Sequence, residues 1–322
     1  MGVLKRIRLG GRRIAAPFFA ATASDDERLW SWKRGVRPDA LLVSYDVLRL
    51  QRQRTTTPVA RTLDFDGVVI VDSGGYGKST EKDPAAVYRV QRTVGATLGV
   101  TLDRIPYTTD SPRVQWAAVN ETVRNARLIR RRHRGRMALE AVIQGATPAQ
   151  FADCGRRLAA LRFDVYGVPV SMQSKYRRYA AAVERVAHAI SALPSKATIH
   201  ALGCGSRTLM AILSYIGVTI FDSRSYYQQA MYGENIEGVT MCALGTPRSK
   251  PTCGACLDRR RPGRTVEART DYNLNETVKE MIRVRCALEE SMMEEYLQRR
   301  LGKKAFNEIS LLIERLTPAR RL

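Results

Sequence analysis

The sequence has no long hydrophobic run. Its longest stretch without a charged residue is 14 residues, from Thr208 to Phe221, whereas a helix that crosses a bilayer needs about 20 apolar residues. The basic N-terminal segment, Met1 to Arg13, reaches Arg12 and Arg13 before any apolar core, so it does not resemble a signal peptide. We therefore expect no membrane association and a cytoplasmic location.

Cysteine is also scarce. Six cysteines in 322 residues are too few for a disulfide scaffold. Two of them, Cys253 and Cys256, form a C-x-x-C pair, which is a spacing found in metal sites. The sequence thus argues against a disulfide-stabilised secreted domain and makes metal binding a hypothesis.

Acidic residues are outnumbered by basic ones. The chain has 31 Asp and Glu against 53 Lys and Arg, which gives a formal net charge of +22. A charge of this size attracts polyanions, and nucleic acid is the commonest polyanion inside cells. A merely solubilising surface is the alternative. The hydrophobic content of 44% excludes wholesale disorder.

Short apolar runs alternate with helical patterns through most of the chain. A run followed by an amphipathic helix, repeated, is typical of a parallel sheet covered by helices. The runs span residues 17–21, 40–44, 67–71, 97–102, 138–143, 163–168, 197–202 and 218–221, and the helical patterns between most of them span 84–94, 113–132, 148–161, 176–193 and 206–216. Eight units predict an α/β fold, a TIM (β/α)8 barrel over residues 1–232.

Polar residues directly follow four of these runs. Catalytic groups of a (β/α)8 barrel lie at the carboxyl ends of its strands. The residues in these positions are Asp72, Asp103, Gln144 and Asp222. We expect them to meet at one end of the barrel.

The pattern changes after Tyr232. A segment dense in Cys, Gly, Pro and Arg runs to about Arg269, and a helical pattern follows from Leu274 to about Leu301. We interpret residues 233–322 as an appended Cys/Arg-rich subdomain, which could bind zinc, with C-terminal helices.

The segment Asp72-Ser73-Gly74-Gly75-Tyr76 precedes Gly77-Lys78-Ser79, which looks like part of a phosphate-binding loop. That loop needs a glycine five residues before Gly77, and Asp72 stands there with a charge that would repel phosphate. The sequence therefore argues against a nucleoside triphosphatase.

The same segment resembles the D-S-G-G-[FY]-Q motif of the queuine and archaeosine tRNA-guanine transglycosylase superfamily, although Gly77 replaces the glutamine. Residues 102–106 resemble the family's base-binding aspartate segment, and residues 142–145 resemble its V-V-Q-G segment. Residues 200–205 and 220–223 resemble the archaeal-type pair H-x-x-G-x-G and L-F-D-S. The four motifs occur in the family's order, and the resemblance, which covers about residues 10–285, implies the same barrel.

The resemblance implies a role for two aspartates. Base exchange must break the glycosidic bond at C1′ and hold the sugar while one base leaves and another enters. A carboxylate nucleophile can do so through a covalent glycosyl-enzyme, with a second carboxylate moving the protons. By this resemblance Asp222 is the nucleophile and Asp72 the general acid/base.

We expect other residues of the same motifs to recognise the base. Asp103 and Gln144 suit the edge of guanine, because a carboxylate accepts from N1–H and the exocyclic amine while an amide can donate to O6. The resemblance makes Tyr76 a residue that stacks on the base. Ser73 and Gly145 complete the expected base-binding set.

The family's structural zinc site reads C-x-C-x-x-C followed by a distant histidine. Here Pro251 replaces the first cysteine and Tyr272 stands in place of the histidine. Cys242 could join Cys253 and Cys256 as a third thiolate, but structural zinc takes four ligands. A zinc site with an unknown fourth ligand and a metal-free remnant both remain open. We expect no organic cofactor.

Two arginine runs stand out, each of which alone would be typical of a solvated face. They are Arg130, Arg131 and Arg132 in the first, and Arg259, Arg260 and Arg261 in the second. We expect both to contact phosphates and hold a polynucleotide over the barrel mouth.

The polynucleotide is either DNA or tRNA. Archaeal tRNA enzymes of the superfamily carry additional C-terminal RNA-binding domains, and bacterial ones read F-D-C-V-x-P-T-R where this chain has residues 221–226. An archaeal-like core without those domains resembles the DpdA group, which inserts 7-deazaguanine bases into DNA in bacteria and phages. The main hypothesis is thus a DNA-guanine transglycosylase that inserts a base such as preQ0, in the host cytoplasm if a phage encodes it.

The alternatives are a tRNA-guanine transglycosylase and a non-catalytic nucleic-acid-binding relative. The second would be expected to lack one of the paired aspartates, and both are present. Whether the chain forms a homodimer stays open.

Overall fold

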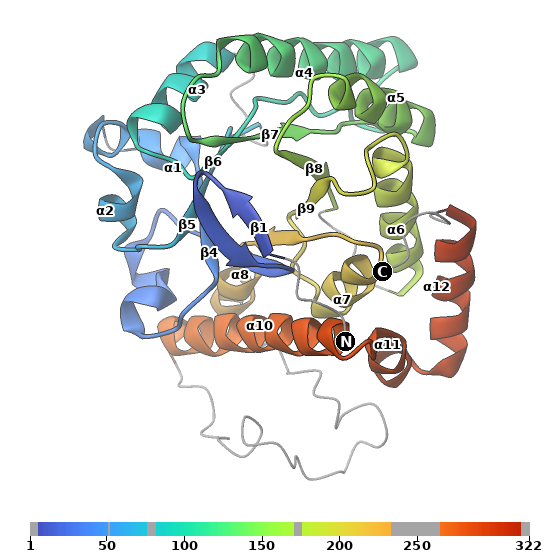
Figure 1. Ribbon diagram of the computed structural model, residues 1–322. Helices are drawn as coiled ribbons and strands as arrows, with labels where there is room; N and C mark the ends of the chain where they lie inside the picture. Colours follow the sequence, from blue (N-terminus) through green and yellow to red (C-terminus); the bar gives the residue numbers. More distant parts are fainter. Residues whose placement is uncertain (1–5, 51, 76–81, 171–175, 233–264, 317–322) are drawn as a thin grey trace.

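The computed structural model describes residues 6–50, 52–75, 82–170, 176–232 and 265–316. Eight parallel strands close into a barrel in the order β10-β3-β4-β5-β6-β7-β8-β9, with helices around it (Figure 1). The strands are β3 (Phe18–Thr22), β4 (Ala40–Ser44), β5 (Val68–Asp72), β6 (Leu98–Val100), β7 (Ala138–Val142), β8 (Val165–Pro169), β9 (Thr198–Leu202) and β10 (Ile220–Ser223). The predicted (β/α)8 barrel is confirmed, and each expected strand forms within two residues of its predicted limits.

A hairpin that the sequence patterns did not predict closes the amino-terminal end of the barrel. Strands β1 (Arg6–Leu9) and β2 (Arg12–Ala15) pair antiparallel and cross this end in Figure 1. Ile7 and Leu9 are buried in one cluster with Phe18 and other residues at the starts of the barrel strands. Strands of four residues offer too few alternations to be recognised from sequence. The hairpin leaves the opposite end of the barrel for ligands.

The helices that follow the strands begin at well-formed caps. The side chains of Asp83, Ser111 and Thr147 accept hydrogen bonds from the first turns of α3, α4 and α5, and each of these helices has proline at its start. The helices are α1 (Tyr45–Arg49), α2 (Val59–Leu63), α3 (Pro84–Thr93), α4 (Pro112–Arg132), α5 (Pro148–Ala159), α6 (Tyr176–Ile190), α7 (Arg207–Tyr215) and α8 (Ser225–Met231). None of the helices in the described part of the chain is long and apolar enough to cross a membrane.

Three C-terminal helices pack against the outside of the barrel (Figure 1). Helix α10 (Val266–Glu289) contacts α8 and β3, α11 (Met293–Leu301) contacts α7, and α12 (Lys303–Leu316) contacts α6. The expected helix from Leu274 to Leu301 is in fact two helices, because Ser291 adopts a left-handed conformation at φ 57° between them. Most of the Cys/Arg-rich segment lies outside the described residues, so the boundary at residue 232 stays a prediction.

Candidate active site

The carboxyl ends of the strands surround a cavity of about 860 Å³. The four polar residues that the sequence placed at strand ends all line it: Asp72, Asp103, Gln144 and Asp222. They come from β5, β10 and the segments after β6 and β7. The structure therefore brings the predicted constellation together at one end of the barrel, opposite the hairpin.

Asp72 ends β5 and leads into a tight glycine turn. Its Oδ2 accepts a hydrogen bond of 2.9 Å from the backbone N–H of Gly74, which has a positive φ of 73° that favours glycine. The Lys82 ammonium holds this turn by donating to the Gly74 carbonyl and, at 2.7 Å, to Asp46 of α1. Burial and, after it, the negative charge of Asp103 raise the pKa of Asp72 to about 7, although the hydrogen bond from the Gly74 N–H opposes the rise.

Asp103 lies beside Asp72 and is fixed by two side chains. Its Oδ2 accepts from Gln144 Nε2 at 2.6 Å, and its Oδ1 accepts from the Ser73 hydroxyl at 3.3 Å. A side chain at Gly75 would overlap the Asp103 carboxylate, which explains the second glycine of the turn. Burial raises the pKa of Asp103, and the hydrogen bonds from Gln144 and Ser73 oppose that rise. We call Asp72 and Asp103 the carboxylate pair.

The neighbours of Asp222 differ from those of the carboxylate pair. Its Oδ1 accepts a hydrogen bond of 2.8 Å from the Gly203 N–H and lies 3.1 Å from His200 Nε2. Its Oδ2 accepts from the Thr22 hydroxyl at 3.2 Å. These contacts fix the carboxylate of Asp222 at the cavity wall.

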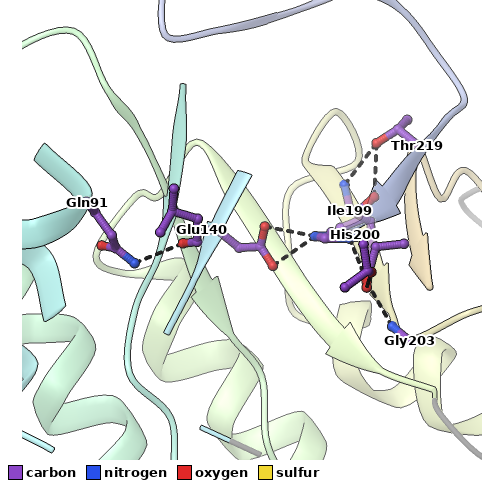
Figure 2. Close-up of polar contacts among 9 residues, drawn as sticks. Gln91, Glu140, Ile199, His200, Gly203 and Thr219 are labelled. Carbon is purple, nitrogen blue, oxygen red and sulfur yellow. Dashed lines mark hydrogen bonds and ion pairs between the residues drawn. The ribbon is translucent and has the colours of Figure 1, made fainter. Parts of the chain in front are cut away.

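His200 joins Asp222 to a second carboxylate. Its Nδ1 lies 2.9 and 3.1 Å from the two carboxylate oxygens of Glu140, as Figure 2 shows. His200 and Glu140 are fully buried inside the barrel. Burial lowers the pKa of His200, but the negative charges of Glu140 and Asp222 outweigh it and raise the pKa to about 10. We call Glu140, His200 and Asp222 the buried triad.

Two residues expected to bind the base are not brought to the cavity wall. Gly145 packs against α5 instead, since a Cβ atom there would lie 2.6 Å from the backbone nitrogen of Phe151. Ser73 is fully buried, and its hydroxyl donates to Asp103. Direct contact of Gly145 and Ser73 with the base stays a prediction. Tyr76 lies outside the described residues.

The first arginine run is also not at the cavity. Arg130, Arg131 and Arg132 end α4, and in a barrel the end of each helix lies at the amino-terminal end of the next strand, here β7. Arg131 and Arg132 are exposed there, while Arg130 donates to the Leu161 carbonyl at 3.1 Å. The expectation that this run lies over the barrel mouth is therefore corrected. Arg259, Arg260 and Arg261 lie outside the described residues.

The expected zinc ligands cannot be placed, because Cys242, Cys253 and Cys256 are outside the described residues. Within the described ranges, no three His, Cys, Asp or Glu side chains gather as metal ligands. Cys154 and Cys204 are buried and free, and Cys286 is exposed and free. Zinc stays a prediction.

The sequence analysis missed the contributions of Glu140, His200 and Thr22. Glu140 and His200 are the charged or ionisable residues within the apolar runs 138–143 and 197–202. A single ionisable residue in a strand that is otherwise apolar is itself a signal, because such a group is buried only when it is paired. That signal could have identified both residues.

A family model described as queuine tRNA-ribosyltransferase matches residues 47–245, which is more than half of the chain. The chain belongs to this family. The matched residues include the carboxylate pair and the buried triad.

Curated members of the family are similar to the chain at low identity. The tRNA-guanine(15) transglycosylase of Methanothermobacter thermautotrophicus is 28% identical over 84% of this chain and 44% of that protein. The enzymes of the same name from Haloferax volcanii and Methanococcus maripaludis strain S2 are 29% and 26% identical over 74% and 93% of this chain. The chain spans about half the length of these relatives.

Proposed function

We propose that this protein exchanges guanine in a polynucleotide for another base through a covalent intermediate on Asp222. One observation carries the proposal: Asp72, Asp103, Gln144 and Asp222 line one cavity at the carboxyl end of the barrel. A non-catalytic relative would not need an acid and a nucleophile on the same cavity.

In the first half of the reaction, Asp222 attacks C1′ and the bond between C1′ and the guanine base breaks. Oδ2 is the oxygen that attacks, because Oδ1 already accepts from Gly203 and faces His200. The departing guanine takes a proton from the neutral carboxyl of Asp72. A pKa of about 7 suits this transfer, since a general acid works best near the ambient pH.

In the second half, the incoming base gives its proton to the Asp72 carboxylate and its nitrogen attacks C1′. The ester bond to Asp222 breaks and the carboxylate is regenerated. Each proton that Asp72 supplies is thus recovered, and the exchange needs no outside reductant or oxidant.

Asp103 and Gln144 read the guanine edge in this proposal. The 2.6 Å hydrogen bond between them fixes the Gln144 amide before the base arrives. Asp103 can then accept from N1–H and the exocyclic amine, and the second N–H of Gln144 can donate to O6. The incoming base must present the same edge, which a 7-deazaguanine such as preQ0 does.

The comparisons favour tRNA as the polynucleotide, because the curated relatives are named for tRNA. This reverses the order that the sequence resemblance suggested, in which DNA came first. Both polynucleotides would present the same nucleotide to the cavity, so the choice between them is made by experiment.

The test measures incorporation of labelled guanine into bulk tRNA, duplex DNA and single-stranded DNA, with Asp222→Asn as the control. We expect label in tRNA, and we expect unlabelled preQ0 to chase it out. Label in DNA alone would replace tRNA by DNA. Label in none of the three would overturn the proposed function.

A further inference from the structure

The buried triad crosses the inside of the barrel from β7 to β10. Strand β8 lies between β7 and β9, and its Gly167 pairs in register with His200. A side chain at Gly167 would overlap the Glu140 carboxylate, so the glycine makes the room through which Glu140 reaches His200. Figure 2 shows the Glu140 carboxylate directed at the His200 ring. Glycine at position 167 therefore allows the contact between Glu140 and His200 to form.

The groups that face His200 favour its charged form. Glu140 of β7 and Asp222 of β10 contact its two ring nitrogens. Asp72 of β5 is close enough to Asp222 and Glu140 for their negative charges to raise its own pKa. Gly167 of β8 and Thr22 of β3 do not titrate, and the buried Cys204 thiol has a raised pKa. The Glu140 carboxylate is within hydrogen-bond distance of Nδ1, and the Asp222 carboxylate lies 3.1 Å from Nε2 as an ion pair without hydrogen-bond geometry, so a charged ring has a negative partner at each nitrogen.

The contacts make the two oxygens of Asp222 unequal. Oδ1 accepts a hydrogen bond from the Gly203 N–H and lies 3.1 Å from the His200 ring, whereas Oδ2 accepts a hydrogen bond from the Thr22 hydroxyl and has no charged partner among the contacts described above. In an ester formed through Oδ2, Oδ1 becomes the carbonyl oxygen. The Gly203 N–H and a positive charge on the His200 ring beside that oxygen stabilise the negative charge that returns when the ester breaks.

We propose that His200 is a positioning residue whose positive charge, secured by Glu140, orients Asp222 for attack through Oδ2 and speeds departure of its carboxylate from C1′. The inference rests on the proposed function. In the second half-reaction the nitrogen–C1′ bond forms, the C1′–Oδ2 bond breaks, and both electrons of the broken bond remain on Asp222. His200 keeps its proton throughout and provides a positive charge beside the leaving carboxylate.

Glu140→Gln tests the source of the charge. Glutamine keeps an oxygen that accepts from His200 Nδ1, but it removes the negative charge, so the pKa of His200 should fall toward neutrality. The readout is the rate at which added guanine chases a preformed covalent adduct, as a ratio of variant to wild type. Because the charge of Glu140 also raises the pKa of Asp72, the ratio is read most directly well above pH 7, where Asp72 is ionised in both proteins.

We expect that ratio to stay within about 3-fold of one near pH 6 and to fall by about 10-fold near pH 9, as the ring loses its proton. The KM for tRNA should be nearly unchanged. A purely structural role predicts a ratio that is lower but constant with pH, and that result would overturn the inference. Tyr166→Phe is the matched control, because it removes a buried hydroxyl from β8 on the side facing the helices.

A second measurement needs no change at Glu140. The chain has three histidines, so nitrogen NMR can follow each ring, with His133→Gln and His188→Gln to assign the third. We expect the His200 ring to stay doubly protonated to about pH 9 in the wild type. An active wild type with a neutral His200 ring would sink this inference alone, whereas a wild type with a charged ring and no exchange activity would sink the proposed function.

Discussion

Asp72 and Asp103 form one side of the cavity with each other's negative charge nearby, whereas Asp222 and Glu140 have His200 between them. Burial and the neighbouring carboxylate raise the pKa of Asp72 to about 7. On the other side, burial lowers the pKa of His200, but the charges of Glu140 and Asp222 outweigh it and raise that pKa to about 10. The comparison teaches that the neighbour decides what an aspartate is suited to do. An aspartate beside another carboxylate is suited to proton transfer, whereas an aspartate beside a cation is suited to nucleophilic attack.

The strongest way to break this comparison is Asp222→Asn. The amide keeps the shape of the side chain but removes the nucleophile, so guanine exchange should fall by about 10³-fold or more. The denaturation-resistant adduct between protein and polynucleotide should disappear from gels. Asp153→Asn, the same change on the outer helix α5, should leave both intact. An adduct at wild-type yield in Asp222→Asn would place the nucleophile elsewhere.

Asp72→Asn tests the other side and should have the next largest effect. Loss of the general acid should slow exchange by about 100-fold while polynucleotide affinity stays nearly constant. In the wild type, adduct formation should decline as the pH rises above about 7, because the neutral acid form of Asp72 is then lost.

The pH profile separates the two sides of the cavity. Asp72→Asn should form adduct slowly at a rate that no longer declines above neutral pH. Stopped reactions across the pH range, with the adduct counted at each time point, measure this. If the variant keeps the wild-type decline, a group other than Asp72 supplies the proton.

The smallest expected effect concerns the two ends of the barrel. Arg104 and Arg113 are exposed near the carboxyl ends of the strands, and Arg131 and Arg132 are exposed at the opposite end. Changing both arginines of either pair to Ala removes two positive charges from that end of the barrel. We expect the first double variant to weaken tRNA binding by about 10-fold and to reduce its salt dependence, and the second to change it by less than about 2-fold.

Binding isotherms at several salt concentrations compare the two double variants directly. Equal losses in both would mean that total charge, and not its place on the barrel, determines affinity. A larger loss in Arg131→Ala/Arg132→Ala would restore the first arginine run as a polynucleotide contact.

The position of the first arginine run at the end of a predicted helix already implied on which end of the barrel it would lie. A charge pattern identifies a basic face but not the end of the barrel that carries it. The direction of α4 decides this, because each helix of a (β/α)8 barrel returns the chain to the amino-terminal end of the sheet. Arg130 to Arg132 close such a helix and so lie far from the carboxyl ends of the strands.

The sequence alone determined the barrel and the four polar residues at its carboxyl end. Both are local properties: an apolar run predicts a buried strand, and a polar residue after it must lie at the strand's end. Motif order also indicated the family, which the family model confirms. These inferences need no knowledge of which strands are neighbours.

Only the tertiary structure decided the electrostatics of the site. Glu140 and His200 are 60 residues apart, and they meet because β8 between them carries glycine at the position that would otherwise separate them. The turn at Gly74 and Gly75 likewise matters because Asp103, from the next strand, approaches it. A pKa depends on the charges and the solvent around a group in space, so the raised pKa values of Asp72 and His200 arise only when the strands close into the barrel.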